Sequence, residues 1–341
     1  MDIQERLELL KRNTQEIVTE EELKKLLKEK KQPSVYLGTA VTGRPHVGYF
    51  MWVLKLADFL KAGFKVKLLL ADIHGALDNC PWDLLENRYK YYSIVIPAMF
   101  EAVGADIKNF EIIKGSEFQL KKEYMFDVLK MSTMASVHDC HKASSDVVKQ
   151  SESPKLSGLI YPIMQALDEE YLGVDVQYGG LDQRKILMFA REHLPKLGYK
   201  NRVEFMTPMI PGLTEGGKMS ASDKSSKIDL LDSEKEIRKK LNSAYCPEGE
   251  IENNGVLAFC KYILFTIKQD KEEDFLIERP EKWGGNLVYK TYKELENDYA
   301  TKKLHPMDLK QSLAKEINSL LDPIRKKLES KQDLIKKAYS E

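Results

Sequence analysis

Cysteine is scarce in this chain of 341 residues, which contains only four of them. No two of the four form a CxxC pair, so their spacing argues against a zinc site. The spacing also does not resemble the disulfide framework of a small secreted protein, and it favours a reducing, cytoplasmic setting. The four are Cys80, Cys140, Cys246 and Cys260.

Long apolar segments are lacking as well. No uninterrupted apolar run is long enough to cross a bilayer. The opening residues MDIQERLELLKRN are polar and amphipathic, and they lack the apolar core of a signal peptide. We therefore expect a cytoplasmic protein without membrane association.

Neither sign of charge is in excess, because 53 Lys and Arg residues balance 53 Asp and Glu residues. A neutral chain can still bind nucleic acid, but its basic footprint must then be local. Hydrophobic residues make up 43% of the chain and charged residues 31%, which indicates a globular rather than a disordered protein. The length is sufficient for two domains.

The order of the apolar runs predicts an α/β fold. SVYLGTA has a strand pattern, the loop VTGRPH follows, and residues 47–63 have a helical periodicity that stops at Gly63. The apolar strand FKVKLLLADIHG completes a βαβ unit, whose strands are parallel. FEIIKG, a helical region from Glu123 to Gln150 and the pattern DVQYGGLDQRKILMFAREHL extend the series. We expect a Rossmann-like, doubly wound parallel sheet, preceded by two amphipathic helices up to about Lys31.

The character of the sequence changes after KIDLLD. From about Ser233 onward charged helical segments dominate, and no β-rich run recurs. We expect a domain boundary near residue 230. A Rossmann-like catalytic domain would then occupy residues 1–230, and a mostly α-helical domain residues 231–341.

The first βα loop contains a candidate nucleotide site, PHVGY at residues 45–49. Ligands of open α/β sheets bind at the carboxyl ends of strands, where a helix N-terminus offers free N–H groups to phosphate. His46 adds a donor for a phosphate oxygen, and Gly48 allows a flat base to approach the backbone. Taken alone, a histidine near a helix start is more often a cap or a surface residue.

A second candidate is the sequence KMSAS at residues 218–222, which several glycines precede. Lys218 is a compact charge suited to pyrophosphate, and Ser220 and Ser222 supply further donors. By itself this segment would be better explained as a flexible, solvated turn.

Together, in this order and at this separation, the two segments resemble the HIGH and KMSKS signatures of class I aminoacyl-tRNA synthetases. Both depart from the pattern, since HVGY ends in tyrosine and KMSAS has Ala221 in place of the second lysine. The resemblance implies in-line attack of an amino-acid carboxylate on the α-phosphate of ATP, with Mg²⁺ accompanying the phosphates. It implies catalytic roles for His46, Gly48, Lys218, Ser220 and Ser222, and ATP binding by Gly38, His46, Gly48, Lys218 and Met219.

A polar trio in LIYPIMQALDEEYLGVD is a candidate for amino-acid recognition. Tyr161, Gln165 and Asp168 fall at i, i+4 and i+7, so they share one face of a helix. A tyrosine pocket needs an apolar slot with polar groups at both ends. The same spacing also suits an ordinary buried polar network, and it does not decide between the two.

Along nearly its whole length the chain resembles the tyrosyl-tRNA synthetases of the archaeal and eukaryotic type. The resemblance rests on VYLGTAVTGRPHVGY, LLLADIH, KGSEFQL, YPIMQALDEEYLGVD, GGLDQRK, SKIDLLD, EKWGGN and LHPMDLK. It implies that Tyr36 and Asp168 bind the hydroxyl of the substrate tyrosine. It further implies contacts to the amino-acid end from Tyr161, Gln165 and Gln183, and a pocket lined by Leu69, Ala71, His74, Phe118 and Gln119.

The same resemblance implies a tRNA partner, with Trp283 stacked on an anticodon base and His305 and Asp308 reading anticodon edges. Residues 302–337 carry ten Lys and Arg against five acids, a pattern that a solvated helical face shares. Lys142 and Lys149 are weaker candidates for contacts to the acceptor stem.

A homodimer is also implied, and the Met-rich stretch from Met125 to Met134 is a candidate contact surface, although a buried core helix has the same pattern. Three alternatives remain: a tryptophan enzyme, a nucleotidyltransferase that does not use tRNA, and an inactive RNA-binding relative. The pairing of Tyr36 with Asp168 argues against the first, and the candidate RNA-binding loops argue against the second. Intact His46 and Lys218 argue against the third.

Overall fold

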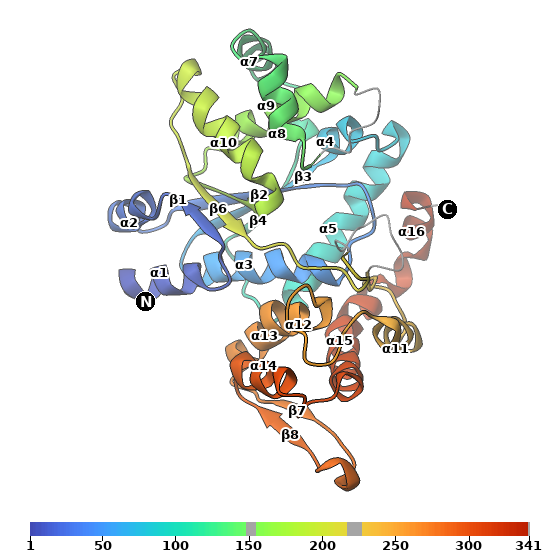
Figure 1. Ribbon diagram of the computed structural model, residues 1–341. Coiled ribbons are helices and arrows are strands. Elements are labelled where there is room, and N and C mark those ends of the chain that lie inside the picture. Colours follow the sequence, from blue (N-terminus) through green and yellow to red (C-terminus); the bar gives the residue numbers. More distant parts are fainter. Residues whose placement is uncertain (148–154, 217–226, 340–341) are drawn as a thin grey trace.

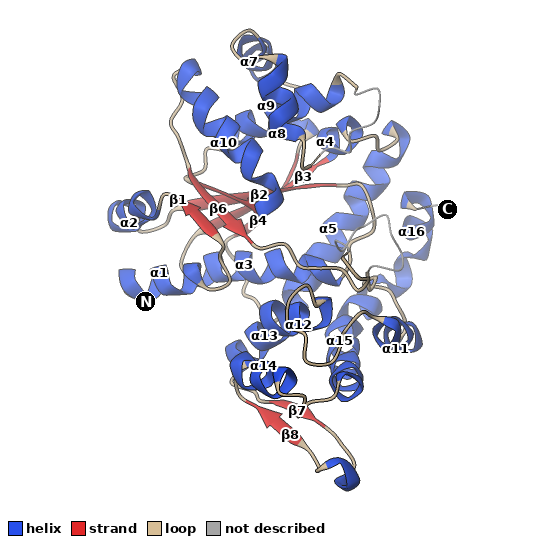
Figure 2. Cartoon of the chain, in the orientation of Figure 1, coloured by secondary structure: helices blue, strands red, loops and turns tan. Residues whose placement is uncertain are grey.

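A sheet of six strands forms the centre of the molecule within the residues that the structure, a computed structural model, describes: 1–147, 155–216 and 227–339 (Figure 2). The order across the sheet is β1-β6-β5-β2-β3-β4. The bounds are β1 (Glu16–Val18), β2 (Ser34–Ala40), β3 (Lys65–Ala71), β4 (Phe110–Lys114), β5 (Val176–Gly180) and β6 (Val203–Thr207).

Helices make up most of the remaining chain. Up to residue 200 they are α1 (Ile3–Lys11), α2 (Glu20–Glu29), α3 (Phe50–Lys61), α4 (Asp72–Leu77), α5 (Leu85–Ala102), α6 (Ser116–Gln119), α7 (Lys122–Ser132), α8 (Val137–Ser144), α9 (Ser157–Tyr171) and α10 (Arg184–His193). Later come α11 (Glu234–Ser243), α12 (Gly255–Phe259), α13 (Phe265–Lys271), α14 (Tyr292–Ala300), α15 (Pro306–Leu328) and α16 (Gln332–Ala338). Short helical turns are η1 (Val47–Tyr49), η2 (Trp82–Leu84), η3 (Leu181–Gln183), η4 (Leu194–Leu197), η5 (Cys260–Leu264), η6 (Glu281–Trp283) and η7 (Glu329–Lys331).

Strands β2 to β6 are parallel, which confirms the Rossmann-like, doubly wound fold. The chain builds outward from β2 through β3 to β4, and then returns to place β5 and β6 on the other side of β2. The strand order therefore reverses between β2 and β5, the position where such sheets bind ligands. The expectation of an all-parallel sheet was wrong at one edge, because β1 pairs antiparallel with β6.

Helices cover both faces of the sheet (Figure 1). One face carries α3 and α5, with α1 packed on α3, and the other carries α9 and α10, against which α7 and α8 pack. The buried apolar side chains of the two faces form separate clusters. Gly63 ends α3 in a left-handed conformation (φ 84°), as its position in the sequence predicts.

The helical region expected from Glu123 to Gln150 is divided into α7 and α8 in its described part. Ser136 begins α8 with a capping box: its hydroxyl accepts from the backbone N–H of Asp139, whose carboxylate accepts from the N–H of Ser136. Such a cap stops the preceding helix from continuing. The strands β1 and β6 were not expected from the sequence.

The C-terminal region is mostly helical, as expected, but a β-hairpin interrupts it. β7 (Phe275–Ile277) and β8 (Leu287–Tyr289) pair antiparallel and project away from the body of the protein (Figure 1). The prediction that no β-rich run recurs was wrong because strands of three residues are too short to show an alternation. Helices α15 and α16 pack back onto α5. Among the described residues no helix is long and apolar enough to span a membrane.

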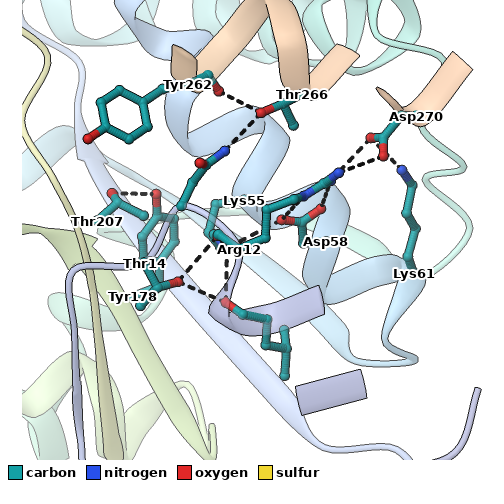
Figure 3. Close-up of polar contacts among 12 residues, drawn as sticks. Arg12, Thr14, Lys55, Asp58, Lys61, Tyr178, Thr207, Tyr262, Thr266 and Asp270 are labelled. Carbon is teal, nitrogen blue, oxygen red and sulfur yellow. Dashed lines mark hydrogen bonds and ion pairs between the residues drawn. The ribbon is translucent and has the colours of Figure 1, made fainter. Parts of the chain in front are cut away.

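An ionic network ties the N-terminal segment to both halves of the chain (Figure 3). Arg12 lies between Asp58 of α3 and Asp270 of α13, with its Nη1 2.8 Å from Asp270 Oδ1. Lys61 Nζ also contacts Asp270, at 2.6 Å. Lys55, whose side chain is buried, donates to the backbone carbonyl of Leu10 at 3.0 Å. The segment before β1 is thereby fixed against α3 and α13 at once.

Candidate active site

A cavity of about 460 Å³ opens at the carboxyl ends of β2, β3 and β5, at the reversal of strand order. This volume lies in the ordinary range for sites of small ligands. The wall includes many of the residues predicted from the sequence: Tyr36, Gly38, His46, Gly48, Leu69, Ala71, His74, Tyr161, Gln165, Asp168 and Gln183.

The polar trio of α9 faces this cavity. Tyr161, Gln165 and Asp168 all line it, so the helical spacing was interpreted correctly. Gln165 Nε2 donates to Gln183 Oε1 at 3.1 Å, which joins α9 to the turn after β5. Tyr36 reaches the same helix from the sheet, because its hydroxyl donates to the carbonyl of Gln165 at 3.2 Å.

Asp168 is buried at the closed end of the cavity. Its Oδ1 accepts from Gln119 Nε2 at 2.8 Å and from the Tyr124 hydroxyl at 2.8 Å. Its Oδ2 lies 3.9 Å from His74 Nε2. Burial raises the pKa of Asp168 to about 8, although the two hydrogen bonds act in the opposite direction. In the free protein this carboxyl is therefore mostly protonated at neutral pH.

His74 lines the cavity next to Asp168 and is also neutral. Burial lowers the pKa of His74 to about 4. Its ring packs edge-on against the ring of Tyr161, with 4.6 Å between centroids, and its Nδ1 lies 3.3 Å from Gln119 Nε2. The closed end thus presents aromatic edges and neutral polar atoms, which is an environment for a ring that carries a hydrogen-bonding group.

His46 also lines the cavity, and it caps η1. Its Nδ1 accepts from the backbone N–H of Gly48 at 3.2 Å. Burial, with a smaller effect of the nearby Lys227 charge, lowers the pKa of His46 to about 3. The neutral ring therefore carries its proton on Nε2, where it is available as a donor to an anionic group.

The segment that follows KMSAS is joined to the loop of His46. Val47 donates its backbone N–H to the carbonyl of Ile228 at 3.0 Å, and His46 forms a β-bridge with Asp229. Arg44 Nη2 contacts Asp229 Oδ1 at 2.9 Å. The loop of His46 is thus in contact with residues 228–229, which follow the second candidate segment in the sequence. Lys218, Met219, Ser220 and Ser222 themselves lie outside the described residues.

Some predicted residues lie behind the cavity or away from it. Gln119 is fully buried and contacts Asp168 and His74 from behind instead of lining the wall. Phe118 likewise lies outside the wall, packed edge-on against Tyr124. Lys142 is exposed on α8, and Lys149 lies outside the described residues.

Several residues that shape the site were not predicted from the sequence, among them Asp78, Asp182, Gln177 and Tyr124. Gln177, on β5, lines the cavity opposite Tyr36 in the sheet register. Its signal was a polar residue inside an otherwise apolar strand. Tyr124 gave no such signal, because α7 reads as an ordinary amphipathic helix and Asp168 lies 44 residues further along the chain.

The candidate RNA-binding residues lie together in the C-terminal region. Trp283 is 65% exposed on η6, the turn that connects β7 to β8. His305 is exposed and caps α15, with its Nδ1 accepting from Met307 N–H at 3.1 Å. Arg279 joins the two loops, since it donates to the carbonyls of Gly285 and of Lys303, the latter two residues before His305.

The fold and the cavity define a Rossmann-like protein with a nucleotide-type loop beside a pocket for a small polar molecule. A family model described as tRNA synthetases class I (W and Y) matches residues 27–322. The chain belongs to this family, which confirms the resemblance inferred from its motifs.

Individual relatives agree with this assignment. The cytoplasmic tyrosine--tRNA ligase of Gallus gallus is 52% identical over 329 residues, which cover 96% of this chain and 61% of that one. The tyrosine--tRNA ligase of Haloarcula marismortui is 46% identical over 343 residues, covering 100% and 99% of the two chains. The crystal structure of tyrosyl-tRNA synthetase complexed with L-tyrosine from Archaeoglobus fulgidus superposes with a TM-score of 0.88 at 40% identity, covering 96% and 100%. The chain thus spans about three fifths of its vertebrate relatives, for example 61% of that of Gallus gallus, and the full length of its archaeal ones.

Proposed function

We propose that this protein is a tyrosine--tRNA ligase, which activates L-tyrosine with ATP to tyrosyl-adenylate and then transfers tyrosine to tRNA. The observation that carries the proposal is that Asp168 and His46, which come from different elements of the fold, line the same cavity. Asp168 is a buried oxygen ligand for a phenol, and His46 stands at a helix start suited to phosphate. The names of the relatives describe the same reaction.

The side chains around the cavity suggest how tyrosine lies in it. Its phenol would contact Asp168 and Tyr36, and its ring would lie along the part of the wall that includes Leu69. Its ammonium would face Tyr161, Gln165 and the neighbouring Gln183. A site built to bind a hydroxyl rejects phenylalanine, because buried polar groups then lose their partner. An indole N–H can donate to a carboxylate but cannot accept a hydrogen bond, whereas a phenol does both, so tyrosine fits the pair of Asp168 and Tyr36 better than tryptophan.

Activation requires ATP, and we propose that it binds over Gly38, His46 and Gly48 with Mg²⁺ on its phosphates. The carboxylate of tyrosine attacks the α-phosphate in line, and pyrophosphate leaves. His46 Nε2–H would donate to the phosphate charge that grows in the transition state. Lys218, Met219, Ser220 and Ser222 would complete this role, in keeping with the junction between their flank and the His46 loop.

We propose that the C-terminal part, residues 231–341, binds the anticodon, whereas residues 1–230 form the catalytic domain. Trp283 is exposed at the turn of a projecting hairpin, as a residue that stacks on an RNA base must be. His305 and Asp308 lie at the start of α15, close in sequence to Lys303, whose carbonyl accepts a hydrogen bond from Arg279. Lys142 and Lys149 would approach the acceptor stem.

We further propose that the protein is a cytoplasmic homodimer whose contact includes α7. This helix buries one apolar face against α9, while Met125, Phe126 and Leu129 of its other face are 38%, 57% and 62% exposed. A second copy would cover such an apolar face. Light scattering on Phe126→Glu/Leu129→Glu should then show a monomer where the native chain shows a dimer.

Pyrophosphate exchange with each amino acid tests the activity. We expect ATP-dependent exchange with tyrosine, weak exchange with phenylalanine or tryptophan, and charging of tRNA. Exchange that depends on tryptophan would show that tryptophan, and not tyrosine, is the substrate. Exchange without charging would indicate a nucleotidyltransferase that does not use tRNA. Binding of tRNA with neither exchange nor charging would indicate an inactive relative.

A further inference from the structure

Tyr124 contacts Asp168 from the side opposite the cavity. It is fully buried on α7, and its hydroxyl lies 2.8 Å from Asp168 Oδ1 and 2.7 Å from the carbonyl of Met164. Among the described residues, the same Oδ1 also accepts from Gln119, whereas Oδ2 has only the 3.9 Å approach of His74. Hydrogen bonds thus hold the carboxyl group through Oδ1, and Oδ2 is available to a ligand in the cavity.

The ring of Tyr124 is fixed, so its hydroxyl cannot readily move away. It packs edge-on against Phe118 and Tyr171, with centroid distances of 5.7 Å and 4.8 Å. The hydroxyl has one proton and two acceptors. Because a hydrogen bond to an ionised oxygen is the stronger, this proton should bind Asp168 when the carboxyl is charged and Met164 O when it is neutral.

We propose that Tyr124 is a positioning residue for tyrosine recognition, which holds Oδ1 of Asp168 so that Oδ2 points at the phenol of the substrate. This inference rests on the proposed function, since it assigns a role within the same site. Tyr124 itself would not touch the substrate. It would act by fixing the orientation of Asp168 and by favouring its ionised form.

The second effect gives the role a distinctive pH signature. A phenol that donates to Asp168 favours the carboxylate, so tyrosine should bind better as pH rises toward the pKa of about 8. The groups that interact with Asp168 are Gln119, Tyr124, His74, Tyr36, Tyr161 and the neighbouring Glu169. Of these, Gln119 and Tyr124 lower its pKa by hydrogen bonding. Removal of the Tyr124 hydroxyl should therefore move the pH dependence to higher pH.

The test compares Tyr124→Phe with Tyr171→Phe. Tyr171 is a matched control because its ring packs on Tyr124, while its own hydroxyl donates to Asp127 at 2.9 Å and not to Asp168. For Tyr124→Phe we expect kcat/KM for tyrosine to fall about tenfold, the value for a lost hydrogen bond to a charged group. Preference over phenylalanine should fall with it, KM for ATP should not change, and the midpoint of the pH profile should rise.

A double-mutant cycle with Asp168→Ala separates positioning from a general loss of packing, because alanine removes the oxygen that Tyr124 contacts. If Tyr124 acts through Asp168, the loss caused by Tyr124→Phe should largely vanish in the Asp168→Ala background. Equal losses in both backgrounds, an unmoved pH profile, or the same behaviour in Tyr171→Phe would overturn the proposal. A native chain without tyrosine-dependent exchange would instead refute the proposed function, and the two failures are therefore distinguishable.

Discussion

Replacement of Asp168 by asparagine tests the closed end of the pocket directly. The variant keeps the shape of the side chain, and its remaining oxygen can still accept from Gln119 and Tyr124 at 2.8 Å each. It cannot ionise, so a phenol loses the charged acceptor. That loss is worth about 1.5–3 kcal/mol, which corresponds to roughly 10- to 150-fold in kcat/KM for tyrosine. Phenylalanine should be affected far less, because it makes no such bond.

The same substitution has a predictable effect on stability. The folded pKa of Asp168 is about 8, well above the unfolded value, so the folded state binds one more proton between those two values. The stability that Asp168 contributes by taking up this proton is present at low pH and is lost as pH rises to about 8. The free energy of unfolding should fall by about 1.4 kcal/mol per pH unit because of this group, or by nearly 3 kcal/mol between pH 5 and pH 7.

Urea unfolding at several pH values measures this slope as the difference between Asp168→Asn and the native chain. The variant should gain stability relative to the native chain as pH increases. The buried Glu169 and Glu204, whose pKa values are also raised by burial, remain in both proteins and largely cancel. Parallel stability curves, or an unchanged preference for tyrosine over phenylalanine, would refute the reasoning about this carboxyl group.

Asp127→Asn is a control for which the change of stability with pH should have the opposite sign. Burial opposes ionisation of Asp127, but hydrogen bonds from Tyr199, Lys130 and Tyr171 outweigh it and lower its pKa. Its contribution to stability is therefore present at neutral pH and is lost as pH falls through the lowered pKa. The stability of Asp127→Asn relative to the native chain should fall as pH rises from the acid range, whereas that of Asp168→Asn should rise.

Three further substitutions probe other parts of the structure. Gly115→Ala would place a Cβ 2.6 Å from Gln119 Oε1 and so displace the Gln119 side chain; kcat/KM for tyrosine should fall about tenfold, and an unchanged kcat/KM would contradict this. Asp270→Asn removes one of the two carboxylate partners of Arg12 and should cost about 1–2 kcal/mol in urea unfolding, a modest value because both side chains are partly exposed; an unmoved midpoint would show that the contact of Arg12 with Asp270 is not stabilising. Trp283→Ala should raise KM for tRNA by at least about fivefold while pyrophosphate exchange is unchanged, and normal charging would exclude Trp283 from RNA binding.

The parts of the fold that the sequence predicts are those fixed by local interactions. The βαβ unit is recognisable because its strands are continuous apolar runs and Gly63 ends the helix between them. The shared face of Tyr161 and Asp168 follows from helical geometry alone. His46 is recognisable as a candidate because a cap and a phosphate site require the same position at a helix start.

The features that were missed depend on partners far away in the chain. β1 has three residues, and it exists because Glu16 meets Met206 at the edge of the sheet. β7 and β8 are equally short, and they stabilise each other. Tyr124 owes its role to Asp168, a contact that no local pattern encodes. Such pairings are set by the tertiary structure, which overrides local propensity.

Three buried titratable groups of the pocket, Asp168, His46 and His74, are uncharged until the substrates arrive. Asp168 is held protonated by burial, whereas His46 and His74 are held neutral by the same desolvation, with pKa values of about 8, 3 and 4. These three side chains therefore avoid the cost of a buried charge in the empty pocket. Tyrosine supplies the phenol that makes ionised Asp168 favourable, so binding should release a proton below about pH 8. Calorimetry of tyrosine binding at pH 7 in buffers of different ionisation enthalpy would measure that proton, and a binding enthalpy independent of the buffer would show that Asp168 is already ionised in the free protein.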